Sequence, residues 1–424
     1  MAWHNTEKDR IRHLLLLTIG PTMRVSQLLS LAPYPLTLLQ GDRCMDGNRI
    51  QVVIFFRSVV AISATIVTLA SQFVLFFFYP NLLYQPTVPI FIVILYYIVS
   101  VLQGMTVAKM LIGCERRRAE YEGYFAEVLP LVKETVEQSD CQLTIRQRNV
   151  AKALLAFYST VALLLPCVMA TVLQDIGSIP YSIAQFVPFG VSYLILVQYY
   201  CVYVHLSAIL RKLNERLAPI VNNTSSIGTH SAFRAKPVVY NILGQPLPSS
   251  KPGINHQDQI EQLRLLHVKV MEIAGHLSVN FGVVIILIVV AAFASVNIDL
   301  LELYQCIKLG NLGPVYIVLK FLFAAIKFSF YVLIAYPNRM IQNEIEHYIS
   351  QLVNVKDVHE ACGMITLDMK LITNIEHYIS QISNLHDIQQ VCGMITLYMK
   401  LVCNVVVAIT SIMVVLIQFA DSGL

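Results

Sequence analysis

The sequence has little charge and no framework of spaced cysteines, and these two absences exclude most soluble and secreted proteins. Only 13% of its 424 residues are charged, whereas a soluble protein typically carries about 25%. Nine cysteines are scattered along the chain without the spacing of metal ligands or of a disulfide framework. The one early apolar patch, 14–19, is followed by Gly20-Pro21 and is too weak for a cleaved signal peptide.

Residues that would mark an enzyme are also missing. No group of His, Asp or Cys side chains gathers at one predicted depth, as the nucleophiles or metal ligands of a membrane enzyme would. His205, His267 and His276 are not spaced with carboxylates or cysteines as a ligand set, so a structural role is favoured. The sequence therefore predicts a protein that is not an enzyme and holds no metal or cofactor.

Long apolar runs are what the sequence has in abundance, since 56% of the residues are hydrophobic. Each run is long enough to cross about 30 Å of hydrocarbon as a helix. Only helices and closed barrels satisfy their backbone hydrogen bonds inside lipid. The sequence therefore predicts an all-α membrane protein with seven transmembrane helices, placed at 58–79, 88–111, 153–174, 182–206, 279–298, 313–336 and 401–420.

The basic residues predict the orientation of these spans. Seven Lys and Arg residues precede the first span, and eight lie in each of the segments 109–152 and 211–269. Because basic residues concentrate on the cytoplasmic side, the N-terminus is predicted to be cytoplasmic and the C-terminus extracellular. A G-protein-coupled receptor has the opposite orientation, and the chain also lacks its Asp-Arg-Tyr and Asn-Pro-x-x-Tyr motifs.

The spans divide the chain into four parts. These are a cytoplasmic N-terminal segment 1–57, spans one to six with their cytoplasmic loops 58–336, a cytoplasmic segment 337–400, and the last span with a short extracellular tail 401–424. Within the second part, 221–255 is rich in Ser, Asn, Gly and Pro and is predicted to be flexible. Residues 257–280 are predicted to be helical, because apolar residues recur there at steps of three or four.

A tandem repeat with a period of 30 residues precedes the last span. The residues IEHYISQ at 345–351 recur at 375–381, and 19 of the 30 positions are identical between 345–374 and 375–404. Two copies are too few to bury the core of a solenoid. The repeat is therefore predicted to be a bent or looped-out insertion beside the membrane.

A short motif in the last span carries the clearest functional information. Ser411-Ile412 and Gln418-Phe419 flank five hydrophobic residues. This pattern resembles the motif of the insect gustatory receptors, which has Thr-Tyr and Gln-Phe at these places in the last transmembrane helix. The helix leading into the fifth span, from Leu263 to Gly282, also resembles that family. One short helical hairpin leads into the last span in gustatory receptors, so one copy of the repeat is surplus to their architecture.

The resemblance implies a tastant-gated, non-selective cation channel in the plasma membrane of sensory neurons. The expected partners are a small-molecule tastant, membrane lipids and other gustatory receptor subunits in a homo- or heterotetramer, but no nucleic acid. The last span of each subunit would line the pore. Gln418 is expected either to face the pore or to form a hydrogen bond between helices. The pore and gate positions are Ser411, Ile412, Val414, Val415, Leu416, Ile417, Gln418 and Phe419.

The resemblance also implies a ligand pocket within each subunit, in the outer half of spans two to six. Aromatic walls with a few polar groups suit a small organic ligand, although tyrosines near a membrane interface are also common as anchors. The candidate ligand-binding residues are Tyr96, Tyr97, Gln174, Asp175, Gln185, Tyr193, Tyr316 and Lys320.

Two lysines, Lys320 and Lys327, lie inside the predicted sixth span, seven residues apart and therefore on one helix face. An ionisable residue within a span is a functional hypothesis by default. Lys320 is expected to pair with Asp175 or Asp299, or to contact the ligand. The alternative is structural, with both lysines reaching the interface or a partner carboxylate.

Two other functions stay open. A related insect chemoreceptor, such as an odorant receptor subunit, shares the arrangement of spans, but the Gln-Phe motif favours the gustatory branch. A multi-span transporter would carry paired inverted repeats with Gly- or Pro-broken spans at matched positions, and the sequence has no such pairing.

Overall fold

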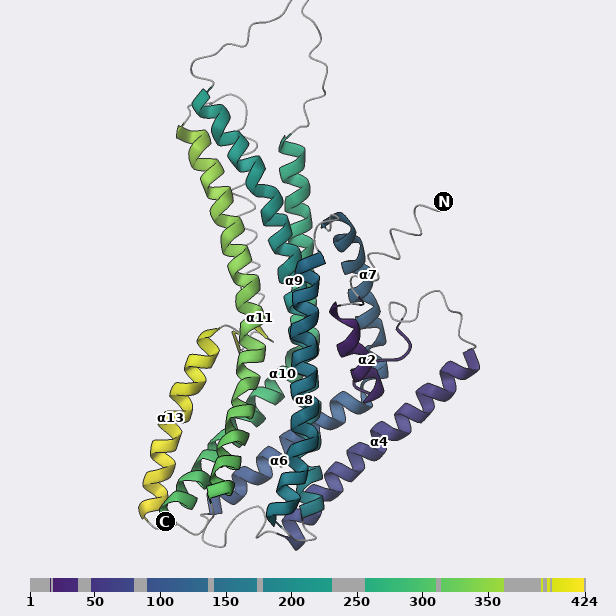
Figure 1. The fold of residues 1–424 in the computed structure, drawn as a ribbon, viewed down its shortest axis with the longest axis vertical. Helices are drawn as coiled ribbons and strands as arrows, with labels where there is room; N and C mark the ends of the chain where they lie inside the picture. Colours follow the sequence, from purple (N-terminus) through teal and green to yellow (C-terminus); the bar gives the residue numbers. More distant parts are fainter. Residues whose placement is uncertain are drawn as a thin grey trace, which may run out of the picture.

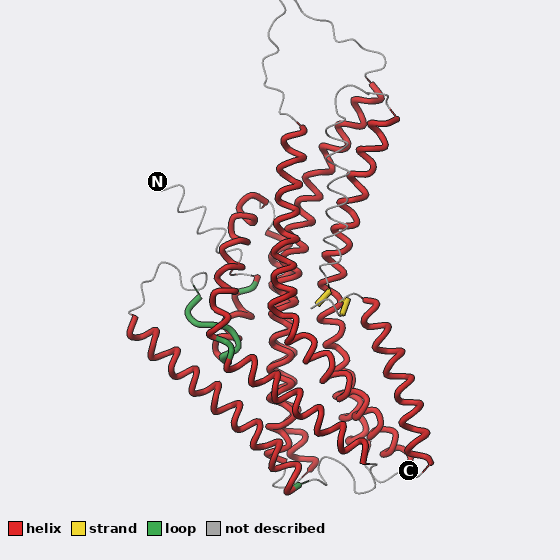
Figure 2. The backbone as a smooth tube through the Cα atoms, turned by 180° about the vertical axis from the view of Figure 1, so that it is seen from behind, coloured by secondary structure: helices red, strands yellow, loops and turns green. Residues whose placement is uncertain are grey.

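The computed structural model describes residues 16, 18–36, 47–79, 90–135, 141–173, 178–230, 256–309, 314–361, 390–391, 395–396 and 399–422. These residues are nearly all helical, as predicted (Figure 1). One antiparallel strand pair, β1 (Gln390–Val391) and β2 (Ile395–Thr396), places Val391 opposite Ile395. Figure 2 shows this pair beside the first turn of the last helix.

The helices follow one another along the chain with short connections. They are α2 (Gly20–Leu28), α4 (Gly47–Phe78), α6 (Ile90–Ile112), the 3₁₀ turn η1 (Glu115–Arg117), α7 (Arg118–Thr135), α8 (Cys141–Leu173), α9 (Ser178–His230), α10 (His256–Leu309), α11 (Pro314–Ala361) and α13 (Met399–Ser422).

Five helices of the described part are long and apolar enough to cross a membrane, namely α4, α6, α9, α10 and α11. The predicted third and seventh spans coincide with α8 and α13. The described apolar stretch of α13, Leu401–Val415, is shorter than a full span. A multi-pass membrane protein is therefore supported, whereas the number seven and the orientation stay predictions.

Several helices continue well beyond the predicted spans. α4 begins at Gly47 rather than at 58, and α9 runs to His230, so 221–230 of the segment predicted to be flexible is helical. Residues 231–255 lie outside the described residues. α10 begins at His256 and confirms the predicted helix 257–280. The bilayer limits the length of the apolar stretch but not of the helix, because the i→i−4 hydrogen bonds continue in water.

The charged ends of α9, α10 and α11 lie together at the top of Figure 1, and the C-terminus lies at the bottom. Arg211 and Lys212 of α9 form ion pairs with Glu215 there, and Arg264 of α10 pairs with Glu261. The basic loop segments that precede and follow these helix ends therefore share one side of the bundle, as the charge pattern predicts.

The core is built around α9, which packs against α4, α8, α10 and α11. Tyr199 and Tyr203 are fully buried on this helix. The Tyr199 hydroxyl is 2.8 Å from the side-chain nitrogen of Asn338, and the Tyr203 hydroxyl donates to the carbonyl of Ala274 at 2.9 Å. A buried tyrosine needs such a partner, so these contacts fix α9 against both α10 and α11.

The tandem repeat lies only partly in the described residues. Residues 345–361 of the first copy complete α11, with Ile345 and Tyr348 buried against the core. Gln390-Val391 of the second copy form β1, whereas the matching residues Glu360-Ala361 are helical. The two copies are therefore not structurally equivalent where both are described.

Candidate functional site

Four buried charged side chains gather between α10 and α11. Asp299 and Glu302 are three residues apart on α10, and Lys320 and Lys327 are seven residues apart on α11, so each pair lies on one helix face. The Asp299 carboxylate accepts a hydrogen bond from Lys327 Nζ at 2.7 Å and lies 4.0 Å from Lys320 Nζ. Glu302 accepts from Lys320. The side chains are only 8–12% exposed, and two acids balance two bases.

The charge balance explains how these residues tolerate burial. An isolated charge in an apolar interior is strongly unfavourable, whereas a hydrogen-bonded pair is tolerated. The sequence interpretation that Lys320 pairs with a carboxylate is met by Asp299 and Glu302. Asp175, the other partner considered, lies outside the described residues.

The charged cluster forms part of the wall of a cavity of about 480 Å³, here called the transmembrane cavity. Helices α6, α9, α10 and α11 contribute Tyr96, Tyr181, Gln185, Ser295 and Phe323 to its lining. A neighbouring cavity of about 420 Å³ shares Gln185, Ser295, Phe323 and Lys327 with it. The two cavities together combine aromatic rings, an amide, hydroxyls and compensated charges, which suits a small organic ligand.

The predicted ligand-binding residues fall into three groups. Tyr96, Gln185 and Lys320 line the transmembrane cavity. Tyr193 is buried beside the neighbouring cavity, where its ring lies 6.2 Å from that of the lining residue Phe189. Tyr97 does not line either cavity, because it is 41% exposed and stacks on Phe76 instead. Gln174 and Asp175 lie outside the described residues, as does the side chain of Tyr316.

Sequence reasoning missed Glu302, Ser295 and Tyr181 as members of this site. The signal for Glu302 was present, because it follows Asp299 by three residues and therefore shares its helix face. Ser295 precedes Asp299 by four residues and lies on the same face. Tyr181 gave no such signal, because a tyrosine near the start of a membrane helix usually serves as an anchor.

The last helix, α13, has one packed face and one exposed polar face. Val405 and Ile409 are buried against the core, and α13 contacts α10 and α11. Asn404, Ser411 and Gln418 are exposed and follow one another at steps of seven residues, so they form one stripe roughly opposite the packed face. The stripe also contains Val407 and Val414.

The motif positions of α13 divide between these faces. Ser411, Ile412, Val414, Val415 and Gln418 are exposed, and Ile417 is partly exposed. The Ser411 hydroxyl donates to the carbonyl of Val407 within the helix at 2.9 Å. Nothing is described of the side chains of Leu416 and Phe419.

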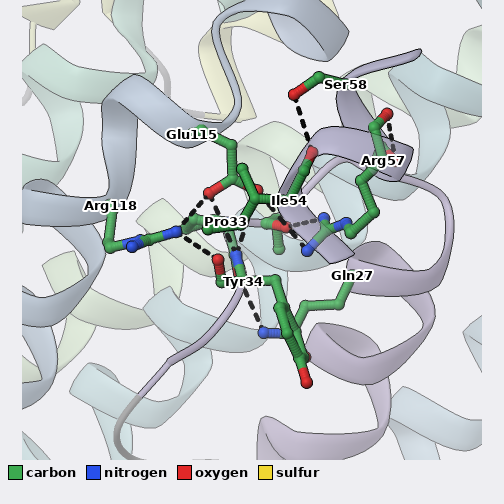
Figure 3. Close-up of polar contacts among 10 residues, drawn as sticks. Gln27, Pro33, Tyr34, Ile54, Arg57, Ser58, Glu115 and Arg118 are labelled. Carbon is green, nitrogen blue, oxygen red and sulfur yellow. Dashed lines mark hydrogen bonds and ion pairs between the residues drawn. The ribbon is translucent and has the colours of Figure 1, made fainter. Parts of the chain in front are cut away.

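A second polar cluster joins the N-terminal segment to α4 and α7 (Figure 3). The Glu115 carboxylate accepts hydrogen bonds from the backbone nitrogen of Tyr34 at 3.3 Å and from Arg118 Nη2 at 2.7 Å. Arg57 Nη1 lies 3.6 Å from the same carboxylate, and its Nη2 donates to the carbonyl of Ala32 at 2.6 Å. We call these contacts the Glu115 cluster, and they fix the loop after α2.

The thiol of Cys114 lies beside the Glu115 cluster and is buried. Burial raises its pKa to about 11, although the neighbouring Arg117 and Arg57 guanidinium groups oppose that shift. Cys114 is therefore a neutral thiol at physiological pH.

The long apolar helices, the buried polar cavity and the exposed stripe on the last helix define a multi-pass helical membrane protein of receptor type. The model of the 7tm chemosensory receptor family matches residues 19–422. The chain therefore belongs to this family, to which the insect gustatory and odorant receptors belong. No curated protein sequence matches the chain.

Proposed function

We propose that the chain is a gustatory receptor subunit that forms a tastant-gated, non-selective cation channel in the plasma membrane of sensory neurons. The polar stripe of α13 carries the proposal. Asn404, Ser411 and Gln418 are exposed on the face opposite the packed residues Val405 and Ile409. Polar side chains are unfavourable against lipid and usually face a bundle interior or water.

Four copies placed around an axis, each with this stripe inward, would form a pore with polar rings. Rings of Val407 and Val414 would lie between the polar rings, and apolar rings of this kind close a pore by dewetting. The motif residues Ser411 and Gln418 would then face the ion path.

The transmembrane cavity is the proposed tastant site. Its charged wall comes from Asp299 and Glu302 of α10 and from Lys320 and Lys327 of α11. Both helices pack directly against α13. A ligand that shifts α10 against α11 would therefore act on the packed face of the pore helix.

Activity is tested by calcium imaging of a cell line without endogenous receptors, transfected with the chain and exposed to sugars, bitter compounds and other tastants. At least one compound is expected to raise intracellular calcium. The response should fall in Gln185→Ala, which removes an amide from the cavity wall.

The pore is tested by thiol accessibility in a Cys403→Ser background, because Cys403 is itself exposed on α13. Ser411→Cys and Gln418→Cys channels are expected to be blocked by a charged, water-soluble methanethiosulfonate. Val406→Cys is the matched control, because Val406 is exposed on a flank of the helix and would face lipid. Conducting channels whose stripe cysteines remain unmodified would exclude α13 as the pore helix.

A further inference from the structure

A separate cavity lies between α2, η1, α7, α9 and α10, and we call it the α7 cavity. It encloses about 400 Å³, which is within the range of small-molecule sites, roughly 300–1,000 Å³. It shares no lining residue with the two cavities described above. Phe281 of the α7 cavity and Ser295 of the transmembrane cavity are about 21 Å apart along α10, at about 1.5 Å per residue.

The walls of the α7 cavity are apolar and held in place by hydrogen bonds. Met23, Val202, Leu277 and Phe281 line it and are at most 7% exposed. The ring of Tyr121 is fixed because its hydroxyl donates to the Gln198 side-chain oxygen at 2.8 Å. The Gln198 amide in turn donates to the Ser26 hydroxyl of α2 at 2.7 Å.

Tyr124 supplies a polar group without a partner at this cavity. It lines the cavity and is only 6% exposed, yet its hydroxyl makes no hydrogen bond with the described residues. Burial raises the pKa of Tyr124 well above its usual value, so the phenol keeps its proton and remains a donor. A buried hydroxyl without a partner is unfavourable by about 1–3 kcal/mol, and a ligand oxygen would remove that penalty.

The mouth of the cavity does not select for net charge. Arg117 and Glu120 both line it and carry opposite charges, and Asn280 adds a neutral amide. Arg117 Nη2 is already bonded to the carbonyl of Met110 at 3.1 Å. A charged ligand would meet one attractive and one repulsive group, whereas a neutral ligand meets neither effect.

We propose that the α7 cavity binds a neutral, mostly apolar molecule that carries one oxygen able to accept a hydrogen bond from Tyr124. The cavity walls match the apolar body, and the unpartnered hydroxyl fixes its orientation. The bound molecule would contact α2, α7, α9 and α10 at once. Since α10 also lines the transmembrane cavity and packs on α13, occupancy would alter the response to a tastant.

Benzophenone is a suitable probe, because it is neutral, has one carbonyl oxygen and inserts into nearby C–H bonds under ultraviolet light. The purified full-length chain in detergent is illuminated with benzophenone, and labelled peptides are identified by mass spectrometry. Peptides that contain Met23 or Leu277 are expected to be labelled. Tyr124→Phe should weaken saturable labelling about fivefold, as expected for one lost hydrogen bond.

Two further variants make the result decisive. Leu277→Trp fills the cavity and should abolish the labelling. Tyr331→Phe is the matched control, because it removes a buried hydroxyl that donates elsewhere, to the carbonyl of Val289, and labelling should be unchanged. Tyr124→Phe should fold normally, since its hydroxyl has no described partner to lose. The proposal is overturned if the Met23 and Leu277 peptides are unlabelled, or if their labelling survives both cavity variants.

Discussion

The buried pair Asp299–Lys327 gives the sharpest energetic prediction. In Asp299→Asn the side chain keeps its shape but loses its charge, while Lys320 keeps Glu302 as a partner. Lys327, 11% exposed, then loses the carboxylate 2.7 Å from its Nζ. Removing one partner of a buried pair is destabilising by roughly 3–5 kcal/mol, because an uncompensated charge remains.

The double variant Asp299→Asn with Lys327→Met tests whether pairing is the cause. It removes both charges and leaves a neutral, similarly sized pair, so most of the lost stability should return. Replacing a buried ion pair by apolar groups is often neutral or stabilising. We therefore expect a coupling energy between the two positions of at least about 2 kcal/mol, near the upper end of the range for residues in contact.

The assay is size-exclusion chromatography of the detergent-solubilised, fluorescently tagged chain after heating. Asp299→Asn should lower the midpoint of thermal inactivation by several degrees, and the double variant should recover it. Glu215→Gln is the control, because its pair with Arg211 has side chains 47% and 56% exposed, and exposed pairs contribute about 0–1 kcal/mol. The reasoning fails if the double variant is as unstable as Asp299→Asn, or if Asp299→Asn matches Glu215→Gln.

Two further predictions concern packing and thiol reactivity. Gly190→Ala should lower the midpoint in the same heating assay, because the added Cβ would lie 2.8 Å from the Tyr158 hydroxyl and overpacking is unfavourable by about 1–3 kcal/mol. Gly123→Ala is its control, since nothing lies within 4 Å of the new Cβ, and it should raise the midpoint slightly through helix propensity. Cys114, whose pKa is raised from 9.0 to about 11, should react with maleimide at pH 8 about a hundredfold more slowly than an unperturbed thiol, because only the thiolate reacts. The rate should rise about tenfold per pH unit between pH 7 and 9, and a pH-independent rate measured by mass spectrometry would contradict the assignment.

Helices were predictable from the sequence where a local pattern defines them. The apolar steps of 257–280 predicted a helix, and α10 confirms it. The ends of α4 and α9 were wrong by many residues, because hydropathy measures the apolar stretch and not the extent of backbone hydrogen bonding. For the same reason, charged residues such as Arg49 and Arg211 lie inside continuous helices.

The candidate site was predictable only in part. Lys320 on a buried helix face called for a carboxylate, and Asp299 was one of two partners considered. Whether Glu302 also took part depended on how α10 and α11 cross, which no spacing within either helix contains. Tyr96 and Tyr97 are neighbours with similar chemistry, yet the packing of α6 places Tyr96 at the cavity and leaves Tyr97 exposed beside Phe76.

The amino-acid sequence by itself determined the class of this protein, because apolar length and backbone hydrogen bonding leave helices as the fitting solution in a membrane. It also determined the family motif in α13. Tertiary structure alone decided which face of α13 packs against α10 and α11, and therefore that Asn404, Ser411 and Gln418 share the free one. It also decided that two acids and two lysines from separate helices neutralise one another in a single cavity. Such contacts depend on the relative rotation of packed helices, and periodicity within one helix does not specify that rotation.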